Sequence, residues 1–231
     1  MSAEVDAVSA AGEVLPVSAK RMDRFPLWLK VSFWLCIGIA VGAVVHRGIA
    51  LVVPSSGSGP GPSAELDAYF ISHAALTWAH IVSALALVSL LPLLFWRRTR
   101  NASGVARAFL LLGLIVGVTA YAMSVHAVGG WVERSAVLLF NTLFMVCLVR
   151  VFLAHRHEEI LETRRWMVRA VAIVLGIAVT RPVMGVFFAT SRLTHWTAHQ
   201  FFGIAFWIGF SVSALTAELW LRKSRFAGDP L

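Results

Sequence analysis

The chain contains, at residues 163–182, the sequence TRRWMVRAVAIVLGIAVTRP, in which a cluster of arginines leads into an apolar run. Such a cluster anchors a transmembrane helix at the membrane surface. Arg181 lies 12 residues beyond Arg169, which is about 18 Å along a helix. Arg181 should therefore lie inside the hydrocarbon, where an ionisable side chain is a candidate functional residue. The alternative is that it snorkels to the far membrane surface, which the roughly ten residues before Arg192 would allow.

The composition of the 231-residue chain is that of a polytopic membrane protein. Hydrophobic residues make up 58% of it, charged residues 14%, and its mean hydropathy is +0.78, which is too apolar for a soluble core. The formal charge of +8 comes from short basic clusters between apolar runs, where basic residues set orientation in a bilayer. The expected partner is therefore the lipid bilayer, and nucleic acid is excluded. Cys36 and Cys147 both fall in apolar runs, so we interpret them as small hydrophobic residues.

Six apolar runs predict an all-α fold, a polytopic membrane helix bundle with six transmembrane helices. The runs cover residues 25–45, 69–96, 105–124, 131–153, 166–189 and 193–221, and helices of such lengths can cross the hydrocarbon. We expect a disordered tail at 1–24, a membrane domain at 25–222 and a second tail at 223–231. His46 and Arg47 mark an interface after the first run, and a short helix on the membrane surface is an alternative for the apolar residues after them.

Two polar segments are predicted to lie at the inner ends of the helices. We interpret residues 155–165, HRHEEILETRR, as a solvated helical extension. In it Glu162 is expected to pair with Arg165, and near the end of the chain Glu218 is expected to pair with Arg222 one turn later. Both carboxylates are thus explained by surface ion pairs.

The distribution of basic residues predicts that both termini are cytoplasmic. With the amino terminus inside, sixteen of the 20 Lys and Arg residues lie at inner ends of the spans, and three, Arg47, Arg134 and Arg192, lie at outer ends. Short loops rich in Lys and Arg stay in the cytoplasm. Tryptophans flank the spans at both predicted boundaries, as interfacial anchors do. We therefore expect the 54–68 loop to lie outside.

Five polar side chains fall at a similar depth in the outer half of the bilayer when residues are counted from the outer boundaries. They are His80, Tyr121, Asn141, Arg181 and His199. Polar groups in lipid have to face the bundle interior, so a shared site open to the outside is one interpretation. The other is a set of separate hydrogen bonds that join neighbouring helices. No carboxylate is expected to face inward in this layer, and no nucleophile set assigns a catalytic residue.

The histidines of this layer suggest two cofactors. A b-type haem needs two imidazoles at matching depth on different helices, which His80 and His199 provide, and Arg181 could pair with a propionate. A zinc ion would instead take His195 and His199, one turn apart, with His80 or His73 as the third ligand. The first hypothesis is a haem-binding or membrane redox protein, which would need a membrane or redox protein partner, since one outer haem cannot carry electrons across about 30 Å of hydrocarbon.

Two other functions remain open. In a small-molecule transporter or binding protein, Arg181 would receive an anionic or polar ligand, because a buried Arg, which costs at least ~2.5–3.5 kcal/mol on insertion, calls for a compensating partner. A structural role as a subunit or assembly factor of a membrane complex is the third hypothesis.

The stretch RRWMVRAVAIVLGIAVTRP resembles the motif of the domain-of-unknown-function 2306 family of predicted bacterial membrane proteins. The resemblance covers about residues 78–221 and includes HIVSALAL from His80, AVGG before Trp131 and AELW before Leu221. It implies a bacterial cytoplasmic (inner) membrane protein, and two departures are Thr163, where the family usually carries His, and the 101–105 segment. The helical layout is also distantly similar to b-type membrane cytochromes, which is an analogy of fold alone. The family's recurrent positions fall on His80, Arg164, Trp166, Met167, Arg169, Arg181 and Glu218.

Overall fold

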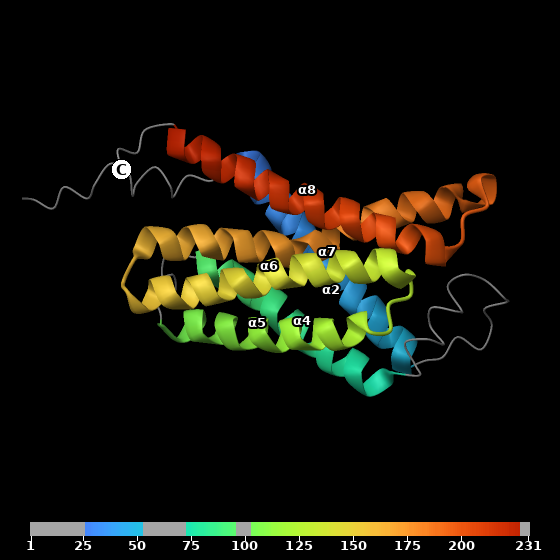
Figure 1. The fold of residues 1–231 in the computed structure, drawn as a ribbon, viewed down its shortest axis with the longest axis horizontal. Coiled ribbons are helices and arrows are strands. Elements are labelled where there is room, and N and C mark those ends of the chain that lie inside the picture. Colours follow the sequence, from blue (N-terminus) through green and yellow to red (C-terminus); the bar gives the residue numbers. More distant parts are fainter. Residues whose placement is uncertain (1–25, 53–72, 96–102, 227–231) are drawn as a thin grey trace, which may run out of the picture.

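The computed structural model describes residues 26–52, 73–95 and 103–226, and this part of the chain is entirely helical. Figure 1 shows the helices running along the long axis of the molecule, with α2 and α4 tilted against the others. The helices are α2 (Leu27–Val52), α4 (Ala74–Phe95), α5 (Ser103–Ser124), α6 (Gly130–Arg156), α7 (Ile160–Thr194) and α8 (Ala198–Phe226). The predicted all-α bundle of six helices is confirmed.

All six helices are long and apolar enough to cross a membrane. The qualifying stretches are between 21 and 32 residues long, with mean hydropathies from 1.5 to 2.3. Large hydrophobic side chains are exposed along their outer faces, for example Leu111 on α5, Val149 on α6 and Leu219 on α8. Side chains of this kind are stable on the outside of a bundle when lipid surrounds it. The protein is therefore a multi-pass integral membrane protein.

Several helix boundaries differ from the predicted ones. α2 continues through His46 and Arg47 to Val52, so these residues lie within one helix and begin no separate surface helix. α8 continues to Phe226, four residues beyond the predicted end of the membrane domain at 222. The predicted tail at 1–24 and the 54–68 loop lie outside the described residues.

The predicted helical extension at 155–165 is wrong, because a turn divides it. α6 ends at Arg156, and α7 begins at Ile160. Between them Glu158 has φ 59°, a left-handed conformation that interrupts a right-handed helix. The turn makes α6 and α7 antiparallel neighbours, and its residues 157–159 are exposed at the end of the hairpin.

The core of the bundle depends on close contact between α7 and α8, which pack along one another more extensively than any other pair of described helices. Gly209 on α8 lies directly against Thr180 on α7, and the Thr180 side chain is fully buried. A Cβ atom at position 209 would lie 2.7 Å from the Thr180 backbone nitrogen. Small residues at such crossings let two helix backbones approach closely, so Gly209 sets the spacing between α7 and α8.

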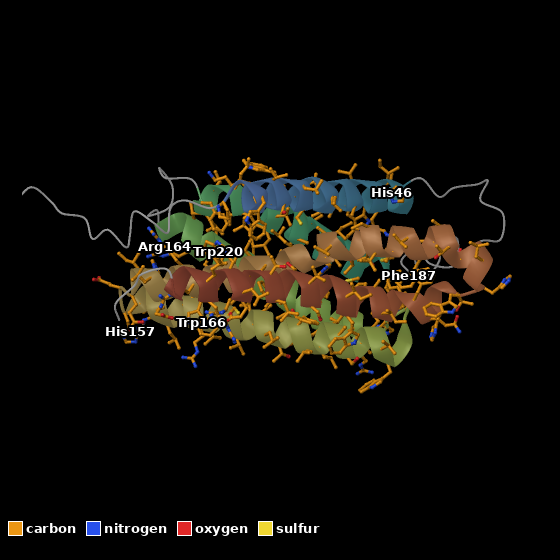
Figure 2. The ribbon with its side chains drawn as sticks, turned by 90° about the horizontal axis from the view of Figure 1, so that it is seen from above. His46, His157, Arg164, Trp166, Phe187 and Trp220 are labelled. Atoms are coloured by element: carbon orange, nitrogen blue, oxygen red, sulfur yellow. The ribbon has the colours of Figure 1, made fainter. Side chains whose placement is uncertain are left out.

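The two ends of the bundle differ in composition. Figure 2 shows His157, Arg164, Trp166 and Trp220 at one end and His46 and Phe187 toward the other. At the first end the Trp166 ring lies between two guanidinium groups, at 4.7 Å from that of Arg169 and 5.5 Å from that of Arg150. Such cation–π contacts hold aromatic anchors in place at a membrane interface.

The same end carries the ion pairs predicted from the sequence. Glu162 and Arg165 lie 2.7 Å apart and Glu218 and Arg222 lie 3.2 Å apart, so both predicted pairs are confirmed. Glu218 also accepts a hydrogen bond from Arg169 at 2.9 Å. This third contact joins α7 to α8. It could not be predicted from the sequence, because the spacing of residues along one helix gives no information about contacts with another helix.

The orientation predicted from the basic residues can be tested at the two described turns. We expect a cysteine at Thr197→Cys, between α7 and α8, to react in intact cells with a membrane-impermeant thiol reagent. A cysteine at Glu159→Cys, between α6 and α7, should react only after permeabilisation, because the arginine-rich ends stay inside. Both positions are exposed, and both variants are made in a Cys36→Ala, Cys147→Ala background. Labelling in the reverse order would show that the protein is inverted.

Candidate functional site

The bundle contains a partly open cavity of about 270 Å³ to which all six helices contribute. It lies in the half of the bundle that contains the α5–α6 turn, since Ser124, His126 and Val128 line it. Its deep part is apolar and is lined by residues such as Leu87, Ile173 and Phe210. A mostly apolar cavity with a few polar groups is typical of a small-molecule site.

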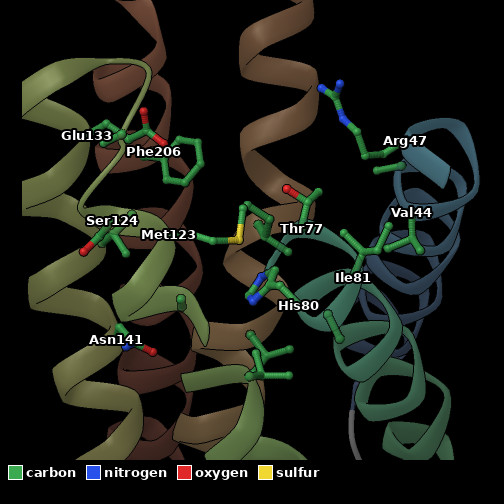
Figure 3. Close-up of a pocket in the computed structure, with 18 of the residues that line it drawn as sticks. Val44, Arg47, Thr77, His80, Ile81, Met123, Ser124, Glu133, Asn141 and Phe206 are labelled. Atoms are coloured by element: carbon green, nitrogen blue, oxygen red, sulfur yellow. The ribbon is translucent and has the colours of Figure 1, made fainter. Parts of the chain in front are cut away.

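The polar groups of the cavity come from five helices and two turns. Figure 3 shows Arg47 on one side of the cavity and Glu133 and Asn141 on the other, with Thr77 and His80 between them. The full polar set is Arg47, His73, Thr77, His80, Ser124, His126, Glu133, Asn141 and Arg181. Of the five residues predicted to form a shared polar layer, the structure thus brings His80, Asn141 and Arg181 together.

Arg47 and Arg181 form the positively charged part of the site. Arg47 projects from α2 and Arg181 from α7, and both also line an adjoining cavity of about 280 Å³ with Ile39, Ala43 and His46. In the part of the chain that the structure describes, no carboxylate forms an ion pair with Arg181. Arg181, with Arg47 lining the same two cavities, is therefore placed to receive an anion.

Glu133 contradicts the expectation that no carboxylate faces inward in this half of the bundle. It is only 9% exposed and lines the cavity. Its Oε2 accepts a hydrogen bond of 2.6 Å from the backbone N–H of Gly129, just before α6. No pattern in the sequence singled out Glu133, but α6 begins with Gly130 at φ 60° and turns Glu133 toward the bundle.

His80 is held by a contact with the neighbouring helix. Its Nδ1 lies 2.8 Å from the Thr119 hydroxyl on α5, and Figure 3 shows its ring within the cavity. The His73 and His126 rings lie against one another at the same cavity, with centroids 4.3 Å apart and an angle of 39° between their planes. Three histidines thus surround one space, and the sequence predicted only His80 among them as a main site residue.

Asn141 and Tyr121 both join α5 to α6 by hydrogen bonds. The Asn141 amide donates to the Gly117 carbonyl at 2.8 Å, and the Tyr121 hydroxyl lies 2.7 Å from that of Thr142. Asn141 lines the cavity as well, whereas Tyr121 does not. For Tyr121 the structure therefore supports the alternative interpretation, a hydrogen bond that joins neighbouring helices.

His195 and His199 lie outside the cavity lining. His199 is exposed and packs at the start of α6, where its Nε2 would be 3.2 Å from a Cβ placed on Gly130. His195 ends α7 in a left-handed conformation and is exposed. Within the described ranges, no three His, Cys, Asp or Glu residues are grouped as metal ligands. The structure does not bring His199 to His80, so the haem ligand pair and the zinc site stay predictions without a supporting contact.

The fold and the site together define a multi-pass membrane helix bundle with a partly charged interior cavity. In comparisons with known proteins, no family model, no curated protein and no solved structure matches the chain. The resemblance to the domain-of-unknown-function 2306 family therefore stays an expectation.

Proposed function

We propose that the protein binds, in its interior cavity, a single-chain amphiphile with an acidic head group. The observation that carries this proposal is the placement of Arg47 and Arg181 at one part of a cavity whose remaining walls are mainly apolar. The arginines would contact the head group, and the apolar tail would lie toward Leu87, Ile173 and Phe210. This is the binding-protein alternative that the sequence suggested, with a more specific ligand class.

Two like charges lie close together in a membrane domain. A charged Arg costs about 2.5–3.5 kcal/mol on insertion scales at the bilayer centre and less toward the interface, and a second guanidinium nearby adds repulsion. A bound carboxylate or phosphate offsets both costs, because Arg forms short, charge-assisted hydrogen bonds with such groups. Glu133 is held at the opposite wall by a hydrogen bond from the Gly129 N–H and forms no ion pair with Arg181.

The size of the cavity favours a ligand with one chain. About 270 Å³ lies near the lower limit of about 300–1,000 Å³ for small-molecule pockets. A fatty acid of medium length is of the right class, whereas the two chains of a phospholipid require more room. With the predicted orientation, the cavity would face the outer half of the membrane.

The proposal is tested by comparing dodecanoate with dodecanol, which differ in the charge of the head group. We expect dodecanoate to raise the thermal unfolding midpoint of the detergent-purified protein in a saturable way, because a ligand that binds only the folded state stabilises it. Dodecanol, which has the same chain, should have a much smaller effect. Equal shifts with both compounds would argue against the arginines as the head-group site.

A haem is the second candidate ligand, because His80, Arg47 and Arg181 line one cavity. His80 could supply one axial ligand and the arginines could pair with the propionates; a haem held there would supply one-electron chemistry. The predicted second ligand, His199, lies outside the cavity lining. An absorbance spectrum after haem-replete expression tests this candidate. A Soret band that is lost in His80→Phe would support it, and the absence of a band would remove it.

A further inference from the structure

The hydrogen bond of His80 determines which of its ring nitrogens carries the proton. The Thr119 hydroxyl lies 2.8 Å from the Ile115 carbonyl oxygen and 3.0 Å from that of Val116. Carbonyl oxygens only accept, so the single hydroxyl proton is used within α5. The assignment that satisfies these contacts together has the hydroxyl accept at its contact of 2.8 Å with His80 and Nδ1–H donate. A neutral imidazole with a proton on Nδ1 has a lone pair on Nε2.

Two hydroxyl groups near this lone pair are already used as donors elsewhere. Thr77 and Ser124, which line the same cavity, donate their hydroxyl protons to the carbonyls of His73 and Tyr121. Among the described residues no side chain donates a hydrogen bond to Nε2 of His80. The partly buried His80 ring lines a cavity large enough for a ligand, and a donor on that ligand would satisfy the lone pair.

We propose that Nε2 of His80 is a recognition point for a neutral hydrogen-bond donor on the ligand, such as a phenolic or alcoholic O–H group attached to an apolar body. This inference uses the same cavity as the proposed function but a different wall and a different chemistry. The arginines select a negative charge, whereas His80 selects an O–H group. Thr119 is the positioning residue, because it fixes the tautomer and the ring orientation, as partners of functional histidines commonly do.

The test compares para-heptylphenol with its methyl ether, two neutral compounds of nearly the same shape. Only the phenol has a proton to donate. The quantity measured is the ratio of the dissociation constants of the ether and the phenol, in detergent-purified protein without added haem. We expect the phenol to bind about three- to ten-fold more tightly, which corresponds to one net hydrogen bond.

Three variants locate the effect. His80→Phe keeps an aromatic ring without the acceptor and should bring the ratio close to one. Thr119→Val keeps the shape of the side chain, removes the partner of Nδ1–H and should lower the ratio even if His80→Phe does not fold. Thr142→Val removes a hydroxyl that joins α5 to α6 outside the cavity lining, so it is the matched control and should leave the ratio unchanged.

The proposal is overturned if the unsubstituted protein does not discriminate between the two compounds, or if discrimination survives in both His80→Phe and Thr119→Val. A Soret band that disappears in His80→Phe would also overturn it, because iron would then occupy Nε2. Since both probes are neutral, failure of dodecanoate to bind would leave this result unaffected, so the two proposals fail independently.

Discussion

Arg181→Gln should bind dodecanoate about ten- to one-hundred-fold more weakly than the unsubstituted protein. A hydrogen bond to a charged group contributes about 1.5–3 kcal/mol, and glutamine retains a polar side chain without the charge. The structure pairs Arg181 with no carboxylate among the described residues, so its removal leaves no unpaired protein anion behind. Dissociation constants measured by calorimetry in detergent provide the comparison.

Arg134→Gln is the matched control for this prediction. Arg134 lies on α6 near the same end of the bundle, close to Trp131, but is not part of the cavity lining. Its replacement removes the same charge and should leave the affinity for dodecanoate nearly unchanged. If both variants lose affinity equally, general attraction between a basic protein and an anion explains the binding, and the cavity is not the site.

Gly209→Val should have the largest effect on stability. The new Cβ would lie 2.7 Å from the backbone nitrogen and 2.9 Å from Cα of Thr180, and backbone atoms in the middle of a helix cannot move aside alone. α7 and α8 would have to separate. Overpacking of this kind costs about 1–3 kcal/mol and occasionally more. The free energy of unfolding in a denaturing detergent titration should fall by that amount or more.

Gly185→Val controls for the change of glycine to valine in a membrane helix. Gly185 lies on α7, and a Cβ added there would have no neighbour within 4 Å. Its replacement should therefore change the free energy of unfolding much less. An equal loss in both variants would mean that the loss arises within each helix and not from the contact between α7 and α8.

The helices could be predicted from the sequence because hydropathy along the chain depends only on which residues follow one another. The α6–α7 turn could not, since the left-handed conformation of Glu158 has no glycine or proline to indicate it. The ion pair of Glu218 with Arg222 follows from helical spacing, whereas its pair with Arg169 depends on how α7 and α8 pack.

The site was only partly predictable because counting residues gives depth but not direction around the helix axis. His80 and Arg181 were identified by depth and do face the cavity, whereas His199, whose depth was counted from a span beginning at 193, lies in the first turn of α8 beside Gly130 and outside the lining. No pattern in the sequence singled out Glu133, and Arg47 was missed as a site residue because its place after an apolar run suggested an interfacial residue. Because α2 extends past Arg47 to Val52, Arg47 lies within the bundle.

We expect an acidic amphiphile to lie inside the bundle with its tail in the apolar part of the cavity. Dodecanoate with a photoreactive diazirine at the end of its chain, followed by mass spectrometry of the labelled peptides, tests this placement directly. Adducts should form on deep cavity residues such as Leu87, Ile173 and Phe210, and excess dodecanoate should suppress them. Adducts confined to outward-facing residues such as Leu111 and Leu219, which are 64% and 67% exposed, or cavity labelling that competitor does not reduce, would contradict this placement.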